Sequence, residues 1–231
     1  MKKVCVIFLT VVLLWGCSDS NPANNNPIEK PPFETEEECL AQHFWYGFSI
    51  DEKIFVDTFL RPNLLFVGFD ETVSNSEIVD IINHFSDFEI ITENRIMSRT
   101  EFKAVFVKTK NYKTCSELNE IRNSLQNNKS VLFANYTYDF MGAYIGYPPP
   151  NGVSSYTNDF VVKIINENDL TKFNELLKQT NTFIKKQTQI YTMISVTKNS
   201  KYDALKMAQY FFETGLFEFS HPNIWSFIGE Y

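Results

Sequence analysis

The apolar pattern of this chain predicts the same order of strands and helices twice, and this repeat limits the available folds more than any other feature. In the first pass, Ser74 follows a dense apolar run and can cap a helix, with Glu77 three positions later. The second helix of this pass begins in the same way, at Thr114 and Glu117. The expected order is a strand at 64–69, a helix at 74–85, strands at 88–91 and 104–107, a helix at 114–125 and a strand at 131–134.

The second pass begins after the proline-rich stretch 147–152, which is the clearest internal boundary of the chain. Residues 191–196 alternate in polarity, as expected of a half-buried strand. Gly215 is expected to end the last helix. The expected order is a strand at 160–165, a helix at 170–177, strands at 182–186 and 191–196, a helix at 204–212 and a strand at 217–219.

Both passes therefore have the order β-α-β-β-α-β. The tripeptide Thr-Lys-Asn occurs at 109–111 and 197–199, between the third strand and the second helix of each pass. An antiparallel sheet with two helices on one face, the ferredoxin-like arrangement, satisfies this order with right-handed crossovers. Aromatic-rich segments at 44–48 and 53–57 flank a turn at 49–52 and come before the first pass. The sequence predicts an α+β protein of two tandem ferredoxin-like units with antiparallel sheets, preceded by a β-hairpin.

The N-terminus predicts export and a lipid anchor. A short basic start precedes an apolar run from Val4 to Trp15, which ends at Gly16 and Cys17. This order resembles a bacterial lipoprotein signal, in which a cysteine after a small residue is lipidated and becomes the mature N-terminus. The alternative is an uncleaved anchor helix, although the run is short for a membrane span. Ser18, rather than Asp, follows the cysteine, and the resemblance implies sorting to the outer membrane of the cell envelope.

The rest of the chain has the size and composition of a globular protein with an exposed leader. Hydrophobic residues make up 44% of the sequence, so a sizeable core can form. Residues 18–33 contain few apolar side chains and are expected to form a disordered tether. The expected boundaries are 1–17 for the signal, 18–33 for the tether, 34–147 for the first unit with its hairpin, 148–158 for a linker, and 159–231 for the second unit with a C-terminal tail.

The net charge argues against a nucleic-acid partner, and the cysteine content allows one disulfide without requiring it. The formal net charge is −7 and no basic stripe is visible, which argues against nucleic acid as a partner. Of the four cysteines, Cys5 leaves with the signal and Cys17 carries the lipid. Cys39 and Cys115 remain, and in an oxidising compartment they form either a disulfide or two buried free thiols. The sequence does not decide between these two states.

Several short segments carry a resemblance to a known family. They are Asp-Phe-Val-Val-Lys at 159–163, Tyr-Thr-Met-Ile-Ser-Val-Thr-Lys-Asn at 191–199, Ala-Leu-Lys-Met-Ala at 204–208, Gly-Leu-Phe-Glu-Phe-Ser-His-Pro at 215–222, and the aromatic segments at 44–46 and 53–56. With these segments, most of the chain from 44 to 225 resembles the N-terminal prodomains of subtilisin-like serine proteases, particularly the lipoprotein forms of Bacteroides-type bacteria. None of the matching residues is catalytic, so the resemblance indicates the fold more firmly than the activity.

The resemblance implies a partner and a binding segment. In that family the prodomain packs its sheet on the protease, assists its folding and threads its C-terminal tail through the substrate cleft. The Asp, His and Ser motifs of the protease domain are absent here, so the resemblance implies a detached module that acts on a protease in trans. The alternative for the C-terminus is that its aromatic side chains cover the sheet edge. The expected partner-binding tail consists of Phe227, Ile228, Gly229, Glu230 and Tyr231.

Motifs for catalysis, cofactors or metals are not found. The histidines, His43, His84 and His221, are scattered without ligand spacing. The acidic run at 36–38 is either a calcium site or, as we prefer, a solvated helix start. A glycan-binding platform would use exposed aromatic residues, although alternation along strands would bury about half of them. Its candidates are Trp45, Tyr46, Tyr136, Tyr138, Tyr144 and Tyr147.

The sequence thus predicts a non-enzymatic, lipid-anchored exported protein without a cofactor. It is expected to bind or inhibit a subtilisin-like protease or to assist the folding of one. One alternative is a glycan- or protein-binding surface lipoprotein that reuses the same fold. Another is the remnant of a protease that has lost its catalytic domain.

Overall fold

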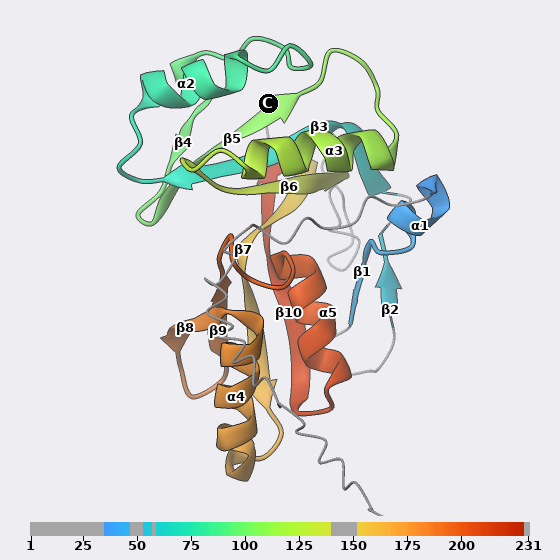
Figure 1. Ribbon diagram of the computed structural model, residues 1–231, viewed down its shortest axis with the longest axis vertical. Helices are drawn as coiled ribbons and strands as arrows, with labels where there is room; N and C mark the ends of the chain where they lie inside the picture. Colours follow the sequence, from blue (N-terminus) through green and yellow to red (C-terminus); the bar gives the residue numbers. More distant parts are fainter. Residues whose placement is uncertain (1–34, 47–52, 57–58, 140–151, 229–231) are drawn as a thin grey trace, which may run out of the picture.

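The computed structural model describes residues 35–46, 53–56, 59–139 and 152–228. These residues form two units with the expected β-α-β-β-α-β order, coloured from cyan to green and from yellow to red in Figure 1. A short helix, α1 (Glu36–Leu40), and a two-stranded hairpin precede them. The predicted α+β fold with two tandem ferredoxin-like units is confirmed.

The first unit is an antiparallel sheet with two helices. Its strands are β3 (Leu60–Asp70), β4 (Met97–Ser98), β5 (Phe102–Lys108) and β6 (Val131–Asp139), and its helices are α2 (Asn75–Asn83) and α3 (Cys115–Gln126). The strands lie in the order β6-β3-β5-β4, which is the ferredoxin-like order. Ser74 and Thr114 cap the two helices as predicted, since each side chain accepts a hydrogen bond from the backbone N–H three residues later.

The prediction of a strand at 88–91 is wrong. Phe88 makes one isolated bridge, to Thr109, and the paired strand of the unit comes later, at β4. The side chain of Asn83 satisfies both backbone polar groups of Ile91: Oδ1 accepts from its N–H at 3.0 Å and Nδ2 donates to its carbonyl at 3.2 Å. Phe88 and Ile91 are buried, whereas Ile90 is 82% exposed. The apolar pattern therefore reflects a loop that packs on the core.

The second unit repeats this arrangement, and its first and last strands are longer than those of the first unit. Its strands are β7 (Gly152–Ile164), β8 (Thr182–Gln187), β9 (Thr192–Val196) and β10 (Phe217–Ile228), and its helices are α4 (Leu170–Thr180) and α5 (Ala204–Glu213). The antiparallel order is β10-β7-β9-β8. Asn181 after α4 has φ 52° and Gly215 after α5 has φ 73°. Both conformations are left-handed and end their helices.

Two expected boundaries differ in the structure. Residues 152–158 form the first half of β7 where a linker is expected, because Val153, Ser154 and Ser155 pair with the end of β6. This pairing joins the strands of both units into one eight-stranded sheet. β10 continues past the expected end at 219, since its second half pairs with the start of β7.

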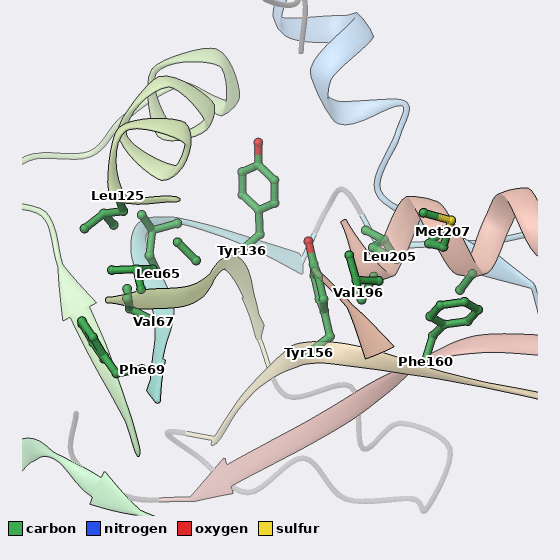
Figure 2. Packing of buried hydrophobic residues seen from close by; sticks show 14 of the residues in the cluster. Leu65, Val67, Phe69, Leu125, Tyr136, Tyr156, Phe160, Val196, Leu205 and Met207 are labelled. Carbon is green, nitrogen blue, oxygen red and sulfur yellow. The ribbon is translucent and has the colours of Figure 1, made fainter. Parts of the chain in front are cut away.

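One hydrophobic core runs through both units. In the first unit it contains Leu65 and Val67, and in the second it contains Phe160. Tyr136 and Tyr156 lie between these two groups (Figure 2). Because this cluster contains buried residues of both units, the two units are packed against each other as one body.

The N-terminal segment crosses from one unit to the other. β1 (Phe44–Tyr46) and β2 (Lys53–Phe55) form the predicted hairpin, but it packs on α5 of the second unit rather than staying with the first. The ring of Tyr46 stacks on Phe212 at 4.2 Å, and its hydroxyl donates to Glu213 Oε1 at 2.8 Å. Helix α1 instead contacts α3 of the first unit. This segment therefore bridges the two units.

Candidate functional site

The start of the predicted partner-binding tail is part of the folded sheet. Phe227 pairs with Val153 as a residue of β10, and Ile228 pairs with Gly152. The ring of Phe227 lies 5.5 Å from that of Phe106 in β5. Phe227 and Ile228 are thus residues of β10, and their expected role in partner binding stays a prediction. The other tail residues lie outside the described residues: Gly229, Glu230 and Tyr231.

A buried aromatic face explains why β10 extends so far. The face of the first unit's sheet opposite its helices carries Phe66, Phe102 and Phe133, and Trp225 and Phe227 pack against it. The rings of Trp225 and Phe102 are 5.3 Å apart. Removing these aromatic side chains from water favours the docking of the end of β10. Phe227 therefore packs on a face of the first unit's sheet, rather than over the sheet edge as the alternative interpretation of the C-terminus expected.

Cys39 and Cys115 form a disulfide, so the bond that the sequence left open is present. Their Cα atoms lie 5.9 Å apart, and the bond joins the end of α1 to the first residue of α3. It fixes the N-terminal segment to the first unit. The predicted lipidation site, Cys17, lies outside the described residues. Within the described ranges, no helix has the length and hydrophobicity needed to cross a membrane.

His43 lies against this disulfide. Its Nδ1 is 2.7 Å from the hydroxyl of Tyr138, and its Nε2 is 3.4 Å from Cys115 Sγ. The ring of Tyr136 meets the imidazole at 4.5 Å in an edge-on arrangement. All of these residues are buried. The group is therefore closed to solvent and is not an open catalytic centre.

A buried ion pair connects the two units beside this group. The guanidinium of Arg122 in α3 donates to Asp203 Oδ2 at 2.7 Å and to Asn119 Oδ1 at 2.9 Å. It also lies over the ring of Tyr136, 4.6 Å from its centre. Burial opposes the charge, but Tyr136 and Asp203 outweigh it and raise the pKa of Arg122 above its ordinary value. Sequence reasoning missed this pair because the spacing of the two residues gives no sign that they meet.

The described aromatic residues of the glycan-platform hypothesis belong to the core. Tyr46, Tyr136 and Tyr138 are buried and Trp45 is half-buried. Burial raises the pKa of Tyr136 and Tyr138 above the ordinary value of a phenol, so both remain neutral. None of these four side chains forms an open platform. The two other candidates lie outside the described residues: Tyr144 and Tyr147.

The remaining polar candidates do not converge on a site. His84 is exposed at the C-terminal end of α2. His221 is half-buried in β10, where burial lowers its pKa. Glu36 accepts hydrogen bonds from the backbone N–H groups of the first two residues of α3, at 2.7 and 3.2 Å, and Glu38 closes the capping box of α1. The acidic run is the helix start that we prefer, and its carboxylates serve helix termini.

An open apolar surface lies at the edge of the second unit. β8 is the end strand of the sheet and pairs, among the described residues, with β9 alone (Figure 1, left). The side chains of Phe183 and Ile184 are 51% and 39% exposed. Beside them is a shallow hollow of about 520 Å³ between α4 and β8. The residues that line it are Asn174, Leu177, Lys178, Asn181, Thr182, Phe183 and Ile184.

The charge of this surface is positive. Lys178 is the one charged residue among those that line the hollow, and Lys186 is exposed farther along β8. Lys185 is engaged, since its Nζ lies 2.7 Å from the carboxylates of both Asp159 and Glu101. These contacts tie the middle of β8 to β7 and to the first unit. Sequence reasoning found no signal for this surface beyond a short expected strand.

Comparisons with known proteins add little to this geometry. A scan against protein-family models finds no match, and neither does a search of curated proteins. Among solved structures, the chain is similar to the small subunit of acetolactate synthase from Thermotoga maritima. The identity is 12% and the TM-score is 0.26, over 74% of this chain and 99% of that chain.

Proposed function

We propose that this chain is a non-enzymatic, lipid-anchored exported protein that binds an extended segment of a partner protein along β8. The observation that carries the proposal is the end strand of the sheet, which exposes Phe183 and Ile184 beside the hollow at α4. The resemblance of the sequence to subtilisin prodomains supplies the class of partner, a subtilisin-like protease. The binding surface proposed here replaces the C-terminal tail expected from that resemblance.

A strand at the edge of a sheet can be extended by a strand from another chain. In this mode the backbone hydrogen bonds supply affinity, and pockets for alternate side chains supply specificity. Ile184 pairs with the buried Ile194 and therefore lies on the helix side of the sheet, next to α4. Phe183 pairs with Ser195 and lies on the opposite side. A partner strand beside β8 would contact both side chains, and its own alternate residues would reach the hollow.

The positive charge beside β8 further limits the kind of partner segment that this surface can bind. Lys178 and Lys186 present positive charge next to the exposed apolar residues, on a chain whose formal net charge is −7. An extended segment with acidic residues complements this surface. A second copy of the chain fits less well, because antiparallel pairing of β8 with itself would bring lysines close to lysines. The proposed occupant is therefore an apolar and acidic segment of a different protein.

The experiment is inhibition of peptide hydrolysis by a broad-specificity subtilisin, measured with the full-length chain in detergent. We expect inhibition by the unaltered chain. The double substitution Phe183→Ser and Ile184→Ser should weaken it about tenfold or more, because hot spots at interfaces cost about 2 kcal/mol or more when removed. Both side chains are already exposed, so the fold should tolerate the change.

A matched control removes two exposed apolar side chains elsewhere. Ile90→Ser and Tyr112→Ser alter residues that are 82% and 77% exposed in the first unit, and they should leave inhibition unchanged. Deletion of residues 229–231 should also leave it unchanged. Equal inhibition by the β8 variant and the unaltered chain would move the site away from β8. Absence of inhibition by the unaltered chain would remove the general protease-inhibitor function.

A further inference from the structure

Three atoms that can bind a metal ion converge beside α3, although the sequence spacing did not indicate a metal site. One donor atom each from Cys39, His43 and Cys115 lies within 4.8 Å of the others, and all three residues are buried. Cys39 belongs to α1, His43 to the turn that follows, and Cys115 is the first residue of α3. In this structure the two sulfur atoms are joined to each other, so the three donors are not available together.

The imidazole is held in the orientation that a metal ligand needs. The Tyr138 hydroxyl lies 2.7 Å from Nδ1, and this contact directs Nε2 toward Cys115 Sγ at 3.4 Å. The phenol oxygen of Tyr138 can accept a hydrogen bond from an Nδ1–H group. A metal-binding histidine almost always has such a partner on its second nitrogen, because that bond fixes the tautomer and the ring plane.

The distances suit a tetrahedral site with two thiolates and one imidazole. Zn²⁺ binds sulfur at about 2.3 Å and nitrogen at about 2.0–2.1 Å, which places neighbouring S and N ligands about 3.5 Å apart. The measured 3.4 Å between His43 Nε2 and Cys115 Sγ is close to that value. The two sulfurs must separate, to about 3.8 Å in the same geometry. The N-terminus of α3 also favours a thiolate at Cys115, although the carboxylate of Glu36 partly offsets that field.

We propose that reduction of the Cys39–Cys115 disulfide creates a binding site for a soft divalent cation such as Zn²⁺, formed by Cys39, His43 and Cys115. An external dithiol supplies two electrons and two protons to the disulfide and is itself oxidised to a disulfide. The two thiols released then lose their protons to solvent as the cation binds, so the bound site carries no net charge. The fourth position is left for water or an external ligand. This proposal is independent of the binding surface at β8.

The test uses the full-length chain in detergent with Cys5→Ala and Cys17→Ala, so that Cys39 and Cys115 are the cysteines that remain. The chain is reduced with a phosphine, desalted, and equilibrated with Zn²⁺ and a weak chelator. We expect one Zn²⁺ per reduced chain and none per oxidised chain. Co²⁺ in place of Zn²⁺ should give a thiolate-to-metal charge-transfer band. A reduced chain that keeps its far-UV circular dichroism but binds no Zn²⁺ would overturn the proposal.

Reduction without metal could also unfold the chain. Recovery of the native circular dichroism on addition of Zn²⁺ would then support the site, because metal binding would be coupled to folding. Failure of Zn²⁺ to restore the fold would count against it.

Variants separate the metal ligands from the support of the fold. Tyr138→Phe keeps the ring but removes the orienting hydroxyl, and it should weaken Zn²⁺ binding by about 10–100-fold. His43→Gln should weaken it at least as much and change the Co²⁺ spectrum. His84→Gln, an exposed histidine elsewhere, serves as the matched control and should leave the affinity unchanged. Unaltered Zn²⁺ affinity in folded His43→Gln would refute the assignment of that ligand and with it the three-ligand site.

Discussion

The two units share one topology but carry different side chains on the same face of their common sheet, the face opposite the helices. In the first unit, the face opposite the helices is apolar and closed. Phe66, Phe102 and Phe133 are buried there, and Trp225 and Phe227 from the other unit pack on them. The aromatic rings of this group lie in direct contact, for example Phe102 and Phe133 at 5.6 Å.

In the second unit the same face carries charged and hydroxyl side chains, and we call it the polar face. Asp159 accepts hydrogen bonds from Ser195 Oγ and from Lys185, and Lys163 pairs with Glu218 at 2.6 Å. Asp159 and Ser195 are buried within their hydrogen bonds, whereas Lys163 and Glu218 are about half exposed. Polar contacts, rather than a packed layer of aromatic rings, therefore satisfy the side chains of this face. The strand order of this fold therefore does not decide whether the sheet face opposite the helices is apolar or polar. The side chains on alternate positions of the central strands decide whether it is closed.

The largest expected effect tests whether two units with such different faces are nevertheless one cooperative body. Asp203→Ala leaves the Arg122 guanidinium buried without its carboxylate and also removes the cap of α5. Breaking a buried ion pair from one side costs about 3–5 kcal/mol, so the free energy of unfolding should fall by about that amount. Urea unfolding followed by circular dichroism measures this loss.

The control for this substitution is an ion pair on the polar face. Glu218→Ala removes the partner of Lys163, where both side chains are about half exposed. Exposed pairs contribute about 0–1 kcal/mol, so the loss should be small. Comparable losses in the two variants would mean that the Arg122–Asp203 pair does not hold the units together.

A second, smaller effect should appear on the closed face. A Cβ atom added at Gly68 of β3 would lie 2.1 Å from the ring of Phe133, which is itself buried. Gly68→Ala should therefore lower the free energy of unfolding by about 1–3 kcal/mol, as overpacked cores do. Phe133→Leu should cost less in the Gly68→Ala background than in the unaltered chain, because the ring that clashes is gone. Strict additivity of the two changes would show that the face is loosely packed.

The sequence could predict the closed face better than it could predict what closes it. The run Leu64 to Phe69 is apolar at both alternating sets of positions, which is typical of a strand buried on both sides. The residues 191–196 alternate in polarity, which predicts a half-buried strand, but in β9 only Met193 is partly exposed and the other residues are buried. Nothing local indicates that Trp225 and Phe227, far along the chain, cover the first unit, because this contact depends on the long register of β7 with β10.

In the candidate sites, too, features set by neighbouring residues could be predicted, whereas contacts between distant parts of the chain could not. Helix caps at Ser74 and Thr114 are local and were predictable, and the even number of remaining cysteines allowed the disulfide. The contact of His43 with Tyr138 joins residues from distant parts of the chain. The exposure of Phe183 depends on β8 being the end strand, which follows from the strand order and not from its own residues.

The smallest expected effect tests the polar face through pH. His221 pairs with Val161 on that face, and burial lowers its pKa from the ordinary value of 6.5 despite its contact with the Pro222 carbonyl. The folded chain therefore binds a proton less readily than the unfolded chain. Above about pH 6.5 both states are neutral at this residue, and the stability that it contributes is complete. As the pH falls through the lowered pKa, the unfolded state is favoured and that stability is lost.

His221→Gln removes this titration, so the comparison with the unaltered chain isolates it from the carboxylates. Between about pH 8 and about pH 5, the free energy of unfolding of the unaltered chain should fall more steeply than that of the variant. Urea titrations at a series of pH values give this difference. Parallel pH profiles would mean that the imidazole is solvated in the folded chain. The outer face of the second unit would then be more open to water than the contacts of β10 indicate, and the contrast between the two units would be larger still.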